Sequence, residues 1–442
     1  MANLSSLGVG SGLDIASLVS QLVAAERAPA QTRLSTAQSR INVQLSAIGT
    51  FKGALSDVRS KLDALRSGAL ATLKATSTRP ETFTASASAA AVAGEYEVEV
   101  VALARAHKLV SGAYLDGAGT VLANGDIDIQ VGGASFTVTL RDGSNTLADL
   151  RRLINEAADN TGVSATLVNE TGGTRLLLTA TATGLAHQIS VDGMAFAERQ
   201  AAADAHLRIE GFDYASASNT VTGAIDGVTL DLVAAEPGVR HRLVVAQDHD
   251  AAHKAISAFV NAYNAAVNTI HSLTRYDADK RQAAPLTGDI TVRGAMQALR
   301  GVLGTGNDGG ALRFLSEIGI ATQTDGTLKL DASALTDALK NDGGGVAQLF
   351  AGEGGYAERL IQVLDGIVGD DGQVSARTDS LQTRLQDLTR QQDALDLRMQ
   401  RVESRYRAQF TALDTLIAQM NGTSSYLTQQ LASLNLLTAK QK

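Results

Sequence analysis

The sequence contains no cysteine and no tryptophan, and only 4 of its 442 residues are proline. Without thiols the chain has neither disulfides nor thiolate metal ligands, and thiol redox chemistry is excluded. Aromatic residues make up 4% of the chain, and this scarcity argues against a deep aromatic ligand pocket. The 42 glycines belong to a composition rich in small residues, which suits packed helices and short strands.

Long apolar runs are absent as well. No run approaches the roughly 18 residues of a membrane-spanning helix, so we expect no membrane insertion. The first residues lack the basic and apolar regions of a cleavable signal peptide, which predicts a cytoplasmic protein or one exported without such a signal. The two ends of the chain are mildly basic and the middle is acidic, but no basic cluster is dense enough to indicate a nucleic-acid partner.

The C-terminal part contains the strongest periodic pattern, between Arg377 and about Asn421. Apolar residues recur there at alternating steps of four and three, the spacing of a coiled-coil seam that needs a partner helix. One seam position, Gln392, is polar, as in coiled coils where a polar residue fixes the register. The seam positions of this helix are Leu381, Leu385, Leu388, Leu395, Met399, Val402, Tyr406 and Phe410.

A second seam lies near the N-terminus, after a flexible Gly-rich lead. Asp14 is predicted to cap a short helix that Pro29 interrupts. Beyond it, apolar residues recur every seven residues in a long helix that ends near Gly68. We expect the two long helices to pack side by side. The seam positions of the N-terminal helix are Leu34, Ile41, Ile48, Leu55 and Leu62.

The segment between the helical parts alternates with period two, as half-buried strands do. Residues 126–131 and 135–140 flank Gly132-Gly133 as a hairpin, and residues 146–160 have the apolar spacing of a helix. Helical periodicity returns after Asp248. The predicted fold is therefore α+β and multidomain: a coiled-coil-like helical leg, formed by both chain ends plus residues 248–376, with a β-rich head inserted.

No catalytic constellation is evident, and we predict that the protein is not an enzyme and has no cofactor or metal. The glycines at 8, 10 and 12 follow no strand and lack the Lys-Ser/Thr of a phosphate-binding loop. His249 and His253 have the spacing of a zinc pair, but a third ligand is not apparent, so surface histidines are the simpler interpretation. No serine lies in a Gly-x-Ser-x-Gly context.

Several motifs carry a resemblance to one family. Gly10-Ser-Gly-Leu-Asp14 with Leu18-Val-Ser-Gln-Leu22 at one end, and Arg405-Tyr-Arg-Ala-Gln-Phe410 with Ser424-Ser-Tyr-Leu427 at the other, resemble the ends of bacterial flagellar filament cap proteins, also called hook-associated protein 2. The internal segments 219–230 and 259–264 are similar to that family too. The resemblance covers essentially the whole chain and is weakest in the head at 109–200.

The resemblance implies a cap of several copies, closed as a ring-like homo-oligomer, at the distal tip of the filament, which promotes folding and polymerisation of exported flagellin. It also implies hook-filament junction proteins, an export chaperone and the type III flagellar export apparatus as partners, and secretion to the flagellum without a cleavable signal peptide. The residues that the resemblance assigns to partner contacts are Gly10, Gly12, Leu13, Asp14, Leu18, Leu22, Tyr426, Leu427 and Leu431.

The family architecture implies flexible ends that order on assembly, and a head of two domains. We therefore expect flexible terminal segments at 1–33 and 421–442, a leg helix at 34–75, an inner head domain at 76–108 and 201–247, an outer head domain at 109–200, and a helical leg domain at 248–420. Three alternatives are weighed: a surface adhesin that binds glycans or host surfaces through the head, a hydrolase at the tip, and another rod, hook or flagellin component. The lack of catalytic residues disfavours the second, and the end motifs disfavour the third.

Overall fold

The computed structural model describes residues 14–439, with side-chain surroundings described as far as residue 431. The chain divides into two compact units. The first comprises residues 1–67, 255–335 and 348–442, and the second comprises residues 68–254 and 336–347. The predicted α+β multidomain fold, a helical leg with an inserted β-rich head, is confirmed.

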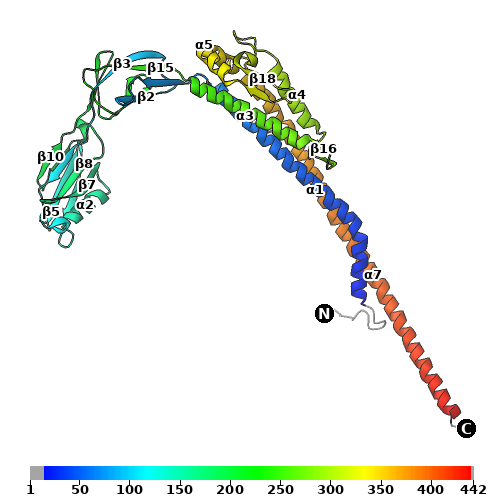
Figure 1. Cartoon of the computed structure of the whole chain (residues 1–442). Helices are drawn as coiled ribbons and strands as arrows, with labels where there is room; N and C mark the ends of the chain where they lie inside the picture. Colours follow the sequence, from blue (N-terminus) through cyan, green and yellow to red (C-terminus); the bar gives the residue numbers. More distant parts are fainter. Residues whose placement is uncertain (1–13, 440–442) are drawn as a thin grey trace. The chain divides into compact units, whose positions relative to one another are not determined.

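The first unit is helical. Its heptad-bearing helices α1 and α7 pack side by side (Figure 1). Helix α6 packs on both of them. Two small hairpins, β16–β17 and β18–β19, accompany the helices. The helices of the chain outside the β-rich head are α1 (Ile15–Ala64), α3 (His249–Thr274), α4 (Ile290–Gly304), α5 (Ala332–Ala351), α6 (Tyr356–Val368) and α7 (Gln373–Ala439). The hairpin strands are β16 (Tyr276–Asp277), β17 (Gln282–Ala283), β18 (Ile320–Thr322) and β19 (Leu328–Leu330).

Two predicted helix ends are wrong. Helix α1 runs through Pro29 without a break, although a proline inside a helix removes a hydrogen bond and costs about 3 kcal/mol. The helix packs against α7 in this region, where Arg27 forms an ion pair with Asp396 two residues before the proline. Helix α7 likewise continues past Asn421, since no proline follows to stop it. The N-terminal helix ends as expected near Gly68, which takes a positive φ of 104°.

The second unit contains two hydrophobic cores, each between two antiparallel sheets. Strands β1 (Leu73–Ser77), β15 (His241–Gln247), β3 (Gly94–Ala102), β11 (Ala205–Ile209) and β12 (Phe212–Ser216) form one sheet in that order. Strands β13 (Thr220–Ile225), β14 (Val228–Leu232) and β2 (Phe83–Ala87) form the other sheet of this core, which includes Phe83, Val100 and Leu230.

The second core of this unit joins a four-stranded sheet, a three-stranded sheet and helix α2 (Leu147–Glu156). The four-stranded sheet has the order β10 (Phe196–Gln200), β4 (Lys108–Ser111), β8 (Gly173–Ala180) and β7 (Val163–Glu170). The three-stranded sheet has the order β6 (Ala134–Leu140), β5 (Gly125–Val131) and β9 (Ile189–Asp192). The hairpin predicted at Gly132-Gly133 is therefore present as β5–β6, and Leu150 and Ile154 of α2 are buried in the core.

Candidate assembly interface

The two seam helices run antiparallel, with a register that specific side chains define. Arg27 of α1 pairs with Asp396 of α7, and Gln31 pairs with Gln392, four residues further along α1 and four residues back along α7. If each step back along α1 corresponds to one step forward along α7, Asp14, where α1 begins, lies opposite about residue 409 of α7. The remainder of α7, to Ala439, continues beyond the described start of α1.

Burial of the seam follows from this geometry. Seam side chains near α6 lie in a core with three or more helices and are fully buried, among them Ile48, Leu55, Leu62 and Leu381. Further along the pair Met399 and Val402 are still buried, but most positions are only half-buried because two helices alone cannot enclose a side chain. The half-buried seam positions are Leu34, Ile41, Leu385, Leu388, Leu395, Tyr406 and Phe410.

A polar layer interrupts the seam at Gln392. Its Nε2 donates to Gln31 Oε1 at 2.8 Å and to Asp396 Oδ1 at 3.2 Å, and Arg27 Nε donates to the same Gln31 oxygen at 3.2 Å. The Oε1 atom of Gln392 is buried without a hydrogen-bond partner. Sliding α1 by one turn would separate Arg27 and Gln31 from their partners Asp396 and Gln392 on α7, so the layer favours one register, which is the role that a polar seam residue has in coiled coils.

Two further links hold the pair in place, and sequence reasoning missed both. Asp289 is 7% exposed, caps the start of α4 through hydrogen bonds to backbone N–H groups, and forms an ion pair at 3.2 Å with Arg377 near the start of α7. Arg59 of α1 forms an ion pair with Asp365 of α6, and that carboxylate raises the pKa of Arg59 through a hydrogen bond. No sequence spacing could have paired residues so far apart in the chain.

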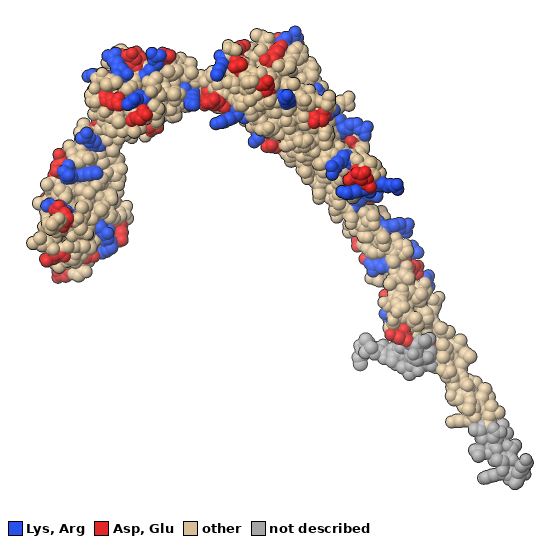
Figure 2. Space-filling model, in the orientation of Figure 1, with Lys and Arg blue, Asp and Glu red and all other residues tan. Residues whose placement is uncertain are grey.

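The predicted contact residues of the tail, the segment of α7 from Asn421 onward, are all exposed. Tyr426, Leu427 and Leu431 are 60%, 55% and 62% exposed, and they continue an exposed apolar series that includes Leu416 and Met420. Asp414 is the only charged residue between Arg407 and Lys440. In Figure 2 the surface of this part of α7 is accordingly almost without charged groups. This lack of charge is visible in the sequence and would have strengthened the prediction.

The predicted contact residues of the N-terminal lead, the segment from Leu13 to Val23, are only partly exposed. Asp14 caps α1 by accepting a hydrogen bond from the Ser17 N–H at 3.0 Å. Leu18 and Leu22 are 37% and 43% exposed, whereas the two other apolar residues of the same turns, Ile15 and Val19, are buried. Part of the apolar face of the lead is therefore already covered in the free protein. Three predicted contact residues, Gly10, Gly12 and Leu13, lie outside the described residues.

The other candidate sites offer little chemistry. Across residues 14–439, no group of three or more His, Asp or Glu side chains is arranged to hold a metal ion. His249 lies at the first position of α3 with its Nδ1 buried and unpartnered. The glycine-rich segment at 8–12 lies outside the described residues. None of the described helices is long and apolar enough to cross a membrane.

Comparison with known proteins covers nearly the whole chain. Residues 11–107 match the family model for the N-terminus of flagellar hook-associated protein 2, and residues 202–422 match the model for its C-terminus. Residues 126–182 match the flagellin hook IN motif. The head segment at 109–200 thus lies largely between the two terminal matches, where the sequence resemblance was weakest.

Individual relatives agree with these matches. Flagellar hook-associated protein 2 of Escherichia coli strain K12 is 35% identical, over 97% of this chain and 98% of the relative. The B-type flagellar hook-associated protein 2 of Pseudomonas aeruginosa is 32% identical over the same shares. A crystal structure of the D1-D2-D3 domains of the flagellar cap protein FliD from Escherichia coli superimposes with a TM-score of 0.61 at 31% identity, and covers 76% of this chain and 99% of that one.

Proposed function

The chain belongs to the flagellar hook-associated protein 2 family, the flagellar cap proteins, and from this membership we propose how it performs the capping role. It sits at the distal tip of the filament and promotes folding and polymerisation of exported flagellin. The observation that carries the proposal is the free end of α7. Its apolar side chains are exposed, it extends beyond α1, and Asp414 is its only charge.

An exposed apolar stripe of this extent needs a covering partner, because contiguous apolar surface on a soluble protein marks an interaction site. Tyr426, Leu427 and Leu431 supply that stripe on the tail, and Leu18 and Leu22 supply a smaller one on the lead. We assign these side chains to contacts with flagellin, hook-filament junction proteins and neighbouring copies in a ring-like homo-oligomer. Gly10, Gly12, Leu13 and Asp14 belong to the same proposed contact set.

Export fits the same segment. An amphipathic helix can lie in the apolar groove of another protein, and the tail, which has no charged residue from Asn421 to Ala439, is our candidate for the segment that an export chaperone binds. We propose that the chain leaves the cell through the type III flagellar export apparatus, without a cleavable signal peptide. The absence of cysteine is compatible with passage as an unfolded chain.

The role proposed here is structural rather than catalytic. The relatives are flagellar cap proteins, and the surface adhesin considered as an alternative gains no support from them. The half-buried seam and its polar layer have a clear place in this role, because they hold the tail on a stiff two-helix support that starts in the helical core.

The test is filament growth in a strain that lacks this protein. Such a strain should release unpolymerised flagellin, and adding the purified wild-type protein should restore filaments. Protein lacking residues 1–30 or 421–442 should fail to restore them, while the β-rich head keeps its folded circular dichroism and NMR spectra. Normal filaments in the deletion strain would refute the capping role, whereas full activity of either truncated protein would refute only our assignment of the ends.

A further inference from the structure

Strand β6 is an edge strand whose outer backbone groups have no hydrogen-bond partner among the described residues. It pairs with β5 alone, in an unbroken register from Val131↔Ala134 to Gly125↔Leu140. The backbone N–H and C=O groups of even-numbered β5 residues point toward β9, as the bond from Gly132 N–H to the Gln188 carbonyl indicates. Those of odd-numbered β5 residues therefore point toward β6, where they meet the backbone groups of even-numbered β6 residues. The odd-numbered β6 residues Ser135, Thr137 and Thr139 thus direct their N–H and C=O groups outward. None of these outward groups has a backbone partner in the part of the chain that the structure describes.

This edge lacks the usual protection against strand pairing. Exposed edges commonly carry lysine, proline or a bulge, and the β6 sequence Ala-Ser-Phe-Thr-Val-Thr-Leu has no charge, no proline and no register shift. The hydroxyls of Thr137 and Thr139 donate to Asp128 and Asp126 on β5, at 2.5 Å and 2.7 Å, and so lean away from the edge. The edge is therefore neutral and open.

The edge strand β7 of the same core provides a contrast. The side-chain amide of Asn155 donates to the Ala165 carbonyl and accepts from its N–H, both at 2.8 Å. Asn160 makes the same pair of bonds with Val163 at 2.8 Å. These two side chains occupy the β7 edge as a neighbouring strand would. No described side chain does so for β6.

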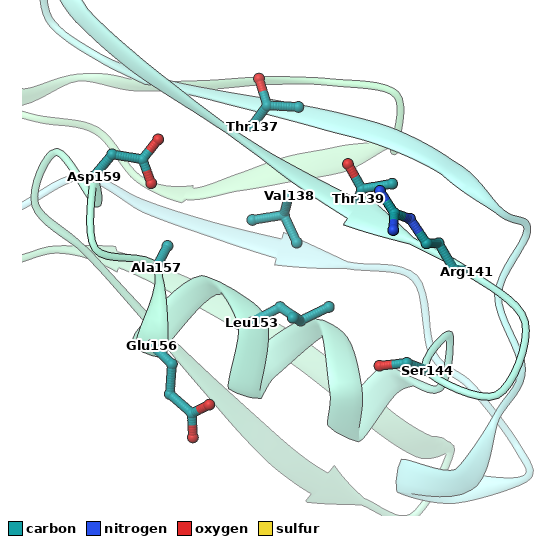
Figure 3. Close-up of a pocket in the computed structure, with 9 residues that line it drawn as sticks. All are labelled: Thr137, Val138, Thr139, Arg141, Ser144, Leu153, Glu156, Ala157 and Asp159. Atoms are coloured by element: carbon teal, nitrogen blue, oxygen red, sulfur yellow. The ribbon is translucent and has the colours of Figure 1, made fainter.

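A groove runs along the open edge, between β6 and α2 (Figure 3). Its volume is about 550 Å³, and its apolar floor includes Val138 and the half-buried Leu153. Arg141 lies at one end and Asp159 at the other. Neither has an ion-pair partner among residues 14–439, while Glu156 on the rim is paired with Arg152 at 3.3 Å.

We propose that this groove binds an extended segment of another polypeptide, which adds to the sheet as an antiparallel strand beside β6. Strand addition satisfies the outward backbone groups, and side-chain pockets select the sequence. Directly opposed residues of antiparallel strands share a face. An acidic residue of the bound segment therefore lies opposite Arg141, and apolar residues lie opposite Leu140 and Val138. A basic residue lies opposite Thr137, toward the end of the groove at which Asp159 lies.

The spacing of the groove residues along β6 defines the sequence of the bound segment. Arg141 and Thr137 are four residues apart on one strand face, which is about 13 Å at the rise of a β-strand. The bound segment has the pattern acidic, apolar, small polar, apolar, basic, from its N-terminus to its C-terminus. The probe is a fluorescein-labelled, C-terminally amidated peptide Asp-Val-Thr-Val-Lys, and its control is the charge-swapped peptide Lys-Val-Thr-Val-Asp.

Titration of the full-length protein, followed by fluorescence anisotropy, should show the probe binding about tenfold more tightly than the swapped peptide, since each exposed ion pair changes affinity about two- to fivefold. The double variant Arg141→Glu/Asp159→Lys should reverse this preference. Because both side chains are exposed, the double substitution leaves the fold intact. Equal affinities for the two peptides, or an unchanged preference in the double variant, would overturn the proposal.

Amide hydrogen exchange, measured by NMR on the deuterated full chain, locates the bound strand. The amides of Ser135, Thr137 and Thr139 should exchange fast in the free protein and become protected with the probe, while those of Phe136 and Val138 are protected in both states. Protection that appears elsewhere would refute the site. Protection of the three amides without peptide, rising with protein concentration, would show that a second copy occupies the edge and would also overturn the proposal.

Discussion

Three leucines of α7, at positions 381, 395 and 427, share one helix and differ in burial. Leu381 is fully buried, Leu395 is half-buried and Leu427 is 55% exposed. Truncation of a buried leucine to alanine costs the lost transfer free energy plus a cavity. We expect Leu381→Ala to lower the free energy of unfolding by about 3 kcal/mol, Leu395→Ala by about 1.5 kcal/mol and Leu427→Ala by less than about 0.5 kcal/mol.

Equilibrium unfolding in urea, followed by circular dichroism at 222 nm, measures these values for the helical unit, because helices dominate that signal. The same three variants should affect capping in a different order. Leu427→Ala, which hardly changes stability, should reduce filament restoration more than Leu395→Ala does. A loss of about 3 kcal/mol at Leu427 would mean that the tail is packed in the free protein. Equal losses at all three positions would refute the burial gradient.

Three other substitutions test single features of the structure. Gln392→Leu should raise the free energy of unfolding by about 1 kcal/mol, because it removes a buried unpaired acceptor, and disulfide trapping between α1 and α7 should detect additional registers. Asp289→Ala should lower stability by about 3 kcal/mol, because it leaves Arg377 without its partner and removes a helix cap, and urea unfolding would reveal the loss. Thr146 donates a hydrogen bond to the Asp149 carboxylate and holds the pKa of Asp149 below its ordinary 3.8. The resulting stability is present above about pH 4 and is lost as the pH falls through the lower pKa of the folded state. Asp149→Asn should therefore flatten the acid dependence of the melting temperature in thermal melts.

The sequence predicted the helical part of the fold well because heptad spacing reports directly on which face is buried. Leu55, Leu62 and Leu381 are all in the core, and the long helices pair as their spacing required. The break predicted at Pro29 was wrong because local propensity was weighed without the tertiary contacts beside it. The exact partners across the pair depend on register, which two independent apolar stripes do not specify.

The β-rich part was harder to predict from the sequence. The hairpin at Gly132-Gly133 was found because two glycines separate two clearly alternating strands. Strand β1, by contrast, crosses residue 75, where the boundary between the leg segment and the inner head domain was expected, and its Lys-Ala-Thr-Ser residues show little hydrophobic contrast. The open edge of β6 could not be predicted at all, because whether a strand has one neighbour or two is decided by the order of strands in the sheet.

The most direct test of the central claim compares two charge insertions on the free end of α7. Leu427→Asp places a carboxylate in the exposed apolar stripe, and Gln429→Asp places one in the same turn at an exposed polar position. Each purified variant is added to the strain that lacks the protein, and filaments and released flagellin are measured. We predict that Gln429→Asp restores filaments and that Leu427→Asp, equally folded by circular dichroism, leaves flagellin unpolymerised. Full restoration by Leu427→Asp would contradict the claim that this stripe makes the capping contacts.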